Sequence, residues 1–123
     1  MDRMDLCKRV GDFHLAEALK KAHEGADGYA VVLLFYANQF YTSCEDSRGR
    51  WICEGVFRDL NVPMGRIDDE LTERGVRPFD YVHGFLDDLF EHFSIMLEDG
   101  NEKDAITFCY EAREGQLFPE KPS

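Results

Sequence analysis

The side chains best placed for chemistry in this sequence are His83, Asp87 and Glu91, which follow one another at intervals of four residues. In a helix this spacing puts them on one face, with Asp80 one turn earlier, where imidazole and carboxylate groups could bind a metal ion. Dimetal carboxylate bundles take a Glu-x-x-His pair from each of two helices. Here Glu91 and His92 are adjacent, so they point about 100° apart, and no second segment supplies a matching pair. The spacing favours a solvated acidic face over a metal centre.

The four cysteines supply thiols without the spacing of a zinc site. Zinc-binding domains usually contain a Cys-x-x-Cys pair, whereas eight residues separate Cys44 from Cys53, and Cys7 and Cys109 lie farther away in the chain. Cys53 and Cys109 fall on apolar faces of expected helices, which is typical of small core residues. We therefore expect reduced thiols, no cofactor, and a protein that purifies without stoichiometric zinc or iron.

A nucleophilic enzyme would need a serine or cysteine beside a general base. The sequence places Ser43, Ser47 and Ser94 outside any nucleophile-elbow motif, and its four histidines fall on expected helices. Its glycines are scattered singly, so the sequence contains no glycine-rich loop for binding phosphate. We expect a protein that is not an enzyme.

Negative charge is the strongest signal in the composition. Asp and Glu number 25 against 14 Lys and Arg, which gives a net charge of −11. Residues 1–62 contain 10 acidic and 8 basic residues, whereas residues 63–123 contain 15 and 6. A C-terminal half with this excess repels phosphate and attracts basic protein surfaces. We expect a basic protein partner, itself a nucleic-acid-binding protein, and no direct contact with nucleic acid.

The apolar spacing predicts a mostly α fold, an irregular bundle of five or six short helices. We expect one domain over residues 1–117 and a C-terminal tail at 118–123. Asp12 is expected to cap the first helix and Gly25 to end it. Further helices are expected at 50–60, around 67–74 with a stop at Gly75, from 78 to Asp99-Gly100, and after Asn101. The strongest apolar stripe belongs to the helix that begins at Pro78: Val82, Phe85, Leu86, Leu89, Phe93, Met96 and Leu97.

The segment 29–44 allows two structures. Its apolar residues include a helical set, but the other faces are apolar as well, and its β-branched and aromatic residues favour strands. We expect a buried helix, and the alternative is a small β-hairpin near residues 40–53 with its turn at 46–49. The longest apolar run, 29–36, is far shorter than the ~20 residues of a membrane span. Because the first residues also lack the apolar stretch of a signal peptide, we expect a cytoplasmic protein without a membrane span.

The segment 56–71 resembles a helix-turn-helix motif through its apolar positions, Val56, Leu60, Val62, Ile67 and Leu71. Asn61 stands where that motif usually has glycine. The resemblance implies a recognition helix at residues 66–73, yet this segment carries four acidic residues against one base. In a DNA groove its carboxylates would face phosphates and base acceptors. We therefore expect a packed helical corner that does not bind DNA.

These observations predict a small acidic, non-enzymatic binding protein that engages a basic surface of a protein partner. In its sharpest form it is an inhibitor that mimics nucleic acid, as small antidefence proteins of phages and mobile elements do. The alternative is a helical regulatory or structural subunit that acts by protein–protein contact, including as a homodimer. We expect most aromatic rings of the 29–51 region to be buried and Trp51 to be a contact residue. The predicted partner contacts are Asp68, Asp69, Glu70, Glu73, Asp80, Asp87, Asp88, Glu91 and Trp51.

Overall fold

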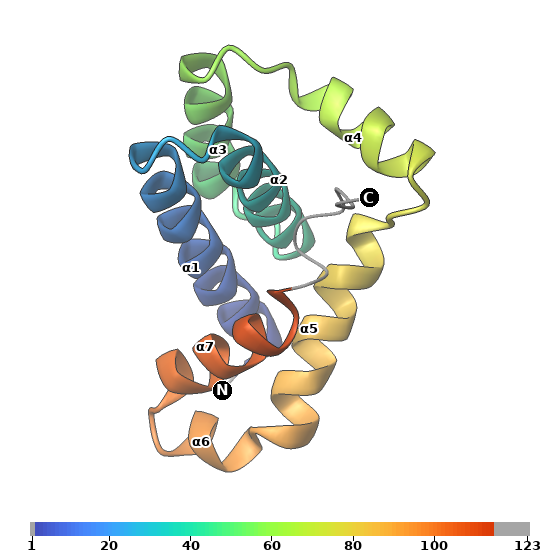
Figure 1. Ribbon diagram of the computed structural model, residues 1–123. Coiled ribbons are helices and arrows are strands. Elements are labelled where there is room, and N and C mark those ends of the chain that lie inside the picture. The colour runs from blue at the N-terminus through green and yellow to red at the C-terminus, as the bar shows by residue number, and fades with distance from the viewer. Residues whose placement is uncertain (1, 115–123) are drawn as a thin grey trace.

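The computed structural model describes residues 2–114, which form seven α-helices and no strand within that range (Figure 1). The mostly α fold is confirmed, with one helix more than the larger expected number. The predicted domain limit at residue 117 and the tail at 118–123 lie outside the described residues. In chain order the helices are α1 (Arg3–His23), α2 (Asp27–Ser43), α3 (Ser47–Asp59), α4 (Met64–Glu73), α5 (Pro78–His92), α6 (Ser94–Glu98) and α7 (Glu102–Ala112).

The segment with two predicted structures is α2, a helix buried on nearly every side. All residues from 30 to 38 are buried, and Figure 1 shows α2 between α1 and α3 on one side and α5 on the other. The β-hairpin near residues 40–53 is wrong, because residues 40–43 complete α2 and α3 begins at Ser47. Burial of apolar side chains all around a central helix outweighs the local preference of β-branched and aromatic residues for strands.

The first helix begins earlier than the predicted cap. α1 starts at Arg3, so Asp12 lies inside the helix. The Asp12 carboxylate accepts a 2.5 Å hydrogen bond from the Tyr41 hydroxyl of α2, and this tertiary contact replaces the capping role that aspartate favours locally. Leu19 of α1 is 46% exposed. The buried stripe of α1 runs through Leu6, Cys7, Val10, Gly11, His14 and Ala18.

The helix with the strongest predicted stripe is interrupted. α5 ends at His92 and α6 begins at Ser94, because the Phe93 backbone leaves the helical conformation, with φ −126° and ψ 19°. Leu89 and Leu97 are buried on the two sides of this break. The expected single helix is therefore two, and α6 packs against α7 at the lower end of the molecule (Figure 1).

The predicted helix stops are confirmed at Gly25, Gly75 and Gly100, whose φ angles are +85°, +77° and +80°. Glycine adopts this left-handed conformation without steric cost. Asn61, in the turn between α3 and α4, also has a positive φ of 58°, which asparagine tolerates better than most residues. Asn101 directly precedes α7, as expected, although its side chain makes no capping hydrogen bond within the described chain.

A buried histidine connects α1 with α5. His14 is completely buried, with its Nδ1 2.9 Å from the Val10 carbonyl oxygen and its Nε2 2.8 Å from the Tyr81 hydroxyl. A carbonyl oxygen can only accept, so Nδ1 carries the proton and the Tyr81 hydroxyl donates to Nε2. Burial lowers the pKa of His14 to about 4, although the hydrogen bond to Val10 opposes this shift. The imidazole is therefore neutral at physiological pH.

Leu89 is fully buried, and we expect Leu89→Ala to lower the free energy of unfolding by about 2–5 kcal/mol, because the truncation removes packing contacts and leaves a cavity. Ile95→Ala is the matched control, since Ile95 is 71% exposed, and it should change the stability by less than about 0.5 kcal/mol. Chemical denaturation followed by circular dichroism measures both. A Leu89→Ala loss as small as that of the control would place Leu89 outside the core.

The buried His14 makes stability depend on pH. The unfolded chain takes up a proton on His14 below about pH 6.5, whereas the folded protein does so only near pH 4. The stability contribution of neutral His14 is therefore complete above pH 6.5 and is lost as the pH falls toward 4, by roughly 3 kcal/mol in total.

Denaturant midpoints measured across this pH range test the effect. In His14→Phe, which cannot titrate, the midpoint should fall less steeply with decreasing pH than in the parent. The exposed His23 provides a control, and His23→Gln should keep the parental slope. A parental slope in His14→Phe would show that other groups cause the pH dependence.

Candidate protein-binding surface

The most acidic part of the predicted surface is α4, a helix attached to the core by few side chains. Leu71 is its one buried residue, with Met64 and Ile67 partly buried beside it. At the start of α4, Asn38 Nδ2 of α2 donates a 3.3 Å hydrogen bond to Met64 Sδ. Figure 1 shows α4 at the edge of the molecule, connected to α3 and α5 by turns. Most of the helix is consequently open to solvent.

Four predicted contact residues lie on the open sides of α4. Asp68, Asp69, Glu70 and Glu73 are all exposed. Asp69 and Glu73 stand two residues before and after the buried Leu71, so each points about 200° away from it. They are one helical turn apart, which places their Cβ atoms about 5–6 Å from each other. The outward side of α4 therefore presents two neighbouring carboxylates, with Asp68 and Glu70 on the flanks.

Ion pairing divides the eight predicted carboxylates into two groups. Four of them lie close to a cationic side chain, and these pairs are Glu70 with Arg74 at 2.9 Å, Asp80 with Arg77 at 3.8 Å, Asp87 with Arg3 at 2.7 Å, and Asp88 with Arg113. The other four, Asp68, Asp69, Glu73 and Glu91, make no ion pair with any residue in 2–114. The paired group is mostly on α5 and the unpaired group mostly on α4.

The ion pairs of α5 connect helices. Asp87 joins α5 to Arg3 of α1, and Asp88 joins it to Arg113, directly after α7. Both partners of the Arg3–Asp87 pair are more than a third exposed, so this pair contributes little stability. These carboxylates nevertheless have internal partners that an external basic surface must displace. The α4 part of the predicted surface is thus better suited to binding than the α5 part.

The row His83, Asp87 and Glu91 does not form a chelating group. The His83 ring packs against the Phe79 ring with centroids 4.0 Å apart, and Asp87 is bonded to Arg3. Across residues 2–114, no three His, Cys, Asp or Glu side chains come together as metal ligands. The predicted core cysteines Cys53 and Cys109 are both buried.

The aromatic residues of the 29–51 region are mostly buried, as expected. Phe35 and Tyr41 are 2% and 1% exposed, and Tyr29 is partly buried against the core. Trp51 is 75% exposed on α3, so the structure leaves it accessible. Trp51 and the carboxylates of α4 lie on different helices, and its contact role remains a prediction.

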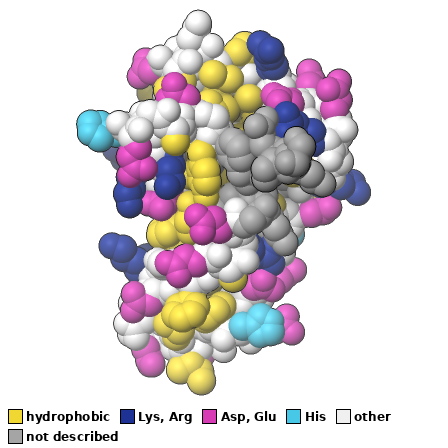
Figure 2. Space-filling view, in the orientation of Figure 1, with side chains coloured by type: hydrophobic (Ala, Val, Ile, Leu, Met, Phe, Trp, Pro, Cys, Tyr) yellow, Lys and Arg dark blue, Asp and Glu magenta, His cyan; other side chains and the backbone are white. Residues whose placement is uncertain are grey.

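Several exposed apolar residues were missed in the sequence, among them Phe79, Ile95 and Phe108. Ile95 of α6 is 71% exposed and Phe108 of α7 is 62% exposed. Figure 2 shows hydrophobic side chains at the lower end of the molecule, where α6 and α7 lie. Phe108 could have been recognised, because it falls outside the α7 stripe of Ala105, Ile106 and Cys109. Ile95 likewise falls outside the predicted stripe, which continues through Phe93, Met96 and Leu97.

The charges on the visible face are mixed. Figure 2 shows acidic side chains interspersed with basic and apolar ones, so the negative charge forms no single continuous field there. An extended acidic surface is therefore not what distinguishes this molecule on that side. On that face, any acidic binding surface would consist of a local group of carboxylates, such as the one on α4.

The corner resembling a helix-turn-helix motif consists of α3 and α4, joined by a turn at residues 60–63. α4 makes its main contact with α2, whereas in the DNA-binding motif the two helices pack against each other. Phe57 of α3 is buried in the common core. The corner therefore shares with the motif the order helix, turn, helix, but its two helices do not pack against each other in the same way.

No protein-family model matches this chain, and comparisons with curated proteins and with solved structures also return no match. Within residues 2–114, none of the helices has the length and apolar character needed to cross a bilayer.

We expect no DNA or RNA binding at physiological salt, because the exposed side of α4 carries carboxylates where a recognition helix needs donors and cations. Gel-shift titrations with duplex DNA, single-stranded DNA and RNA measure this. Submicromolar affinity that weakens with added salt would restore the helix-turn-helix interpretation.

Proposed function

We propose that the protein is a small acidic, non-enzymatic binding protein that uses α4 to engage a basic surface of a protein partner. The observation that carries this proposal is the open surface of α4, where Asp69 and Glu73 on the outward side and Asp68 on a flank are exposed and make no ion pair with residues 2–114. These carboxylates are available to a partner without the loss of an internal contact.

The energetics of α4 support the proposal. Like charges one helical turn apart destabilise a helix by a few tenths of a kcal/mol, so Asp69 and Glu73 weaken a helix that has one buried residue. Arg66 lies one turn before Asp69 and Glu70 but makes no ion pair with either. A partner that places arginine or lysine side chains over this face would relieve the repulsion.

The partner class follows from the charge pattern. Carboxylates at one-turn intervals match cationic side chains that are arranged in a row, as they are in grooves that bind phosphate backbones. In its sharpest form the proposal is an inhibitor that occupies a nucleic-acid-binding groove, acting in the cytoplasm as antidefence proteins of phages and mobile elements do. Asp80, Asp87, Asp88 and Glu91 are secondary contacts in this proposal.

A second candidate function is a helical regulatory or structural subunit that acts by protein–protein contact, including as a homodimer. The observation favouring it is the exposure of Trp51, Ile95 and Phe108. Large apolar side chains of this kind are typical anchors of protein interfaces. Binding through them would depend weakly on salt, whereas binding through α4 would depend on it strongly.

Charge reversal on α4 tests the proposal. We expect the double variant Asp69→Lys/Glu73→Lys to weaken partner binding on the order of tenfold, mainly by slowing association, while its circular dichroism spectrum stays parental. Glu70 is left unchanged because it pairs with Arg74. The partner is first captured from native lysate and identified by mass spectrometry at low and high salt, and binding is then measured with purified components.

The matched control is Glu45→Lys/Asp59→Lys, which makes the same change in net charge at two exposed positions flanking and ending α3. We expect this variant to bind nearly as tightly as the parent. Equal weakening in both variants would indicate that net charge alone matters, and unchanged binding in the α4 variant would favour Trp51, Ile95 and Phe108 as the contacts.

A further inference from the structure

One face of α3 combines an exposed aromatic ring with a cationic side chain. The buried residues of the helix are Gly49, Cys53 and Phe57. Trp51, Gly55 and Arg58 follow one another at intervals of four and three residues, so they form a row along the helix, and at about 100° per residue this row lies opposite the buried side. Trp51 is 75% exposed, and Arg58 is exposed as well. α3 therefore presents to solvent a row unlike the carboxylates of α4.

The charges of α3 oppose self-association less than those of the chain as a whole. Ser47–Asp59 contains three arginines and two acidic residues, a net charge of +1, whereas the whole chain carries −11. Repulsion between two copies is therefore weaker at α3 than at the acidic helices. Glu54 and Arg58 are one turn apart and exposed, yet neither makes an ion pair with residues 2–114. Both charges remain available to an external partner.

Gly55 leaves a gap in the row between Trp51 and Arg58. Within the described chain, a Cβ atom at this position would meet only Nη2 of Arg58, at 3.9 Å. The φ angle of Gly55 is not positive, so neither crowding nor turn geometry within residues 2–114 requires glycine. Glycine lowers helix stability relative to alanine, but it allows a second backbone to approach closely. The gap therefore suits the crossing point of a second helix.

An open pocket of about 340 Å³ lies at the C-terminal end of the row. It is lined by Glu54, Phe57, Arg58, Val62, Pro63 and Met64. Four apolar residues thus lie beside two side chains of opposite charge. Arg58 belongs to both the row and the pocket, and it stands about 10 Å along the helix axis from Trp51. α3 carries an exposed indole at one end and a largely apolar pocket at the other.

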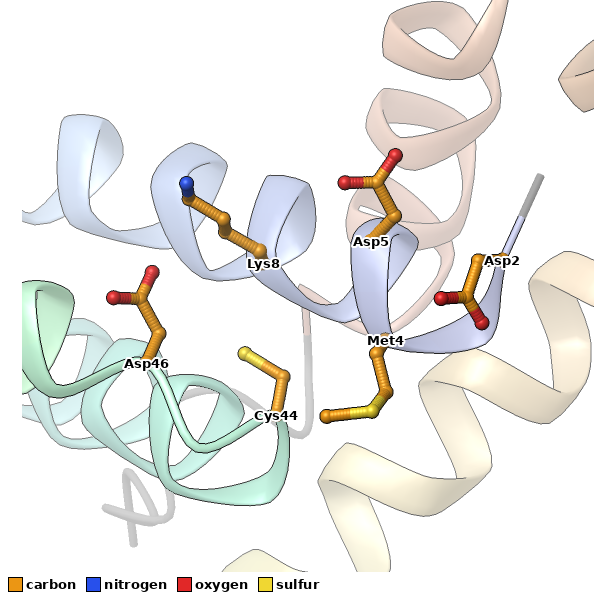
Figure 3. A pocket seen from close by; sticks show the side chains of 6 residues that line it. All are labelled: Asp2, Met4, Asp5, Lys8, Cys44 and Asp46. Carbon is orange, nitrogen blue, oxygen red and sulfur yellow. The ribbon is translucent and has the colours of Figure 1, made fainter.

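A larger pocket between α1 and the end of α2 lacks these features. It has a volume of about 480 Å³ and is lined by Asp2, Met4, Asp5, Lys8, Cys44 and Asp46. Figure 3 shows Asp2, Asp5 and Asp46 around this opening, with Lys8 as the one base among the described residues that line it. Three carboxylates against one base repel another acidic chain. A second copy is therefore better accommodated at α3.

We propose that α3 is the interface of a two-fold symmetric homodimer, in which the two α3 helices pack antiparallel and cross near Gly55. In this arrangement Trp51 of each copy lies opposite Arg58 of the other, because the two residues lie on either side of the crossing point at nearly equal distances. The indole ring covers the apolar pocket beside Arg58 and makes a cation–π contact with its guanidinium. Glu54, on the same side of α3, lies within reach of the same arginine. The two-fold axis repeats each contact.

The face is complementary to itself, which distinguishes a second copy from other occupants. An aromatic ring and its cation, a carboxylate and its cation, and an apolar side chain and its pocket are all on or beside one helix, and each pair is matched under a two-fold rotation. A nucleic acid would use Trp51 and Arg58 but would leave Glu54 facing phosphates. The inference rests on the homodimer of the second candidate function, to which it gives a surface, and it uses no residue of α4.

Sedimentation equilibrium of the full-length protein tests the dimer. A single helix pair forms a small interface, so we expect a monomer–dimer equilibrium with a Kd between about 1 μM and 1 mM. Gly55→Gln should weaken association at least about tenfold, because the side chain fills the crossing point, while the helix stays intact since a Cβ atom has room there. The matched control is Gly65→Gln on α4, where a Cβ atom also has room, and it should keep parental affinity.

A second pair of variants tests the aromatic contact. Trp51→Ala should weaken association at least about tenfold, because it removes the central aromatic anchor. Phe108→Ala removes another exposed ring, 62% exposed on α7, and should leave the Kd of the dimer unchanged.

Charge variants test the two-fold arrangement. Arg58→Glu and Glu54→Arg should each associate several-fold more weakly than the parent, because each variant places like charges opposite each other twice. An equimolar mixture of the two variants should form a mixed dimer more tightly than either variant forms its own, since both opposite-charge pairs are restored across its interface. Asp69→Lys/Glu73→Lys should dimerise like the parent, which separates this inference from the role proposed for α4.

The inference is overturned if the protein is monomeric at about 1 mM, if Gly55→Gln dimerises as tightly as the parent, or if the mixture of charge variants gains no affinity. Loss of the dimer in Phe108→Ala would move the interface to α7, and its loss in Asp69→Lys/Glu73→Lys would move it to α4. Binding of single-stranded DNA or RNA that Trp51→Ala abolishes, in the absence of a dimer, would identify nucleic acid as the occupant.

Discussion

The fold depends on the burial of α2. A helix that is apolar all round has no side that can face water, so other helices must enclose it. α1 packs along its length, and α3, α4 and α5 cover the remaining sides. Each enclosing helix packs apolar side chains against the core, α5 also against α7, and its remaining sides are open to solvent. The acidic residues of α4 and α5 are consequently pushed to the outside, where a partner can reach them. The position of the candidate surface is thus a consequence of the apolar character of α2.

Close packing around Tyr41 shows how tightly α2 is enclosed. A Cβ atom at Gly49 of α3 would lie 2.3 Å from the Tyr41 ring, and one at Gly11 of α1 would lie 2.9 Å from it. Neither position has room for a larger residue without a shift of the ring. Burial, together with the hydrogen bond to Asp12, raises the pKa of Tyr41, so its hydroxyl remains a donor. Three helices therefore meet around one aromatic ring, and the buried His14–Tyr81 contact fixes α5 against the same core.

Features that depend on neighbouring residues could be predicted from the sequence. Helix stops at glycine, the apolar stripe around Leu89 and the turn at Asn61 were all recognisable because each depends on a few neighbouring residues. The predicted capping role of Asp12 was wrong, because its hydrogen-bond partner, Tyr41, is 29 residues away in the sequence. The helix break at Phe93 coincides with no glycine or proline, so no local signal in the sequence marked it. The eight carboxylates could be named from composition, but their division into paired and unpaired groups could not, since Arg3 and Arg113 come from the two ends of the described chain.

The division of the carboxylates into ion-paired and unpaired groups changes how the net negative charge should be interpreted. A net charge of −11 would suggest an acidic surface of uniform character. In the folded protein, Asp87 and Asp88 are bonded to arginines that link α5 with α1 and the end of α7, so they already have partners within residues 2–114. Asp69 and Glu73 have no such partners within residues 2–114, and their mutual repulsion weakens the helix that carries them. Solubility alone could be achieved by charges at any exposed position. The placement of unpaired carboxylates side by side on the most weakly attached edge helix is therefore the feature that a binding role explains best.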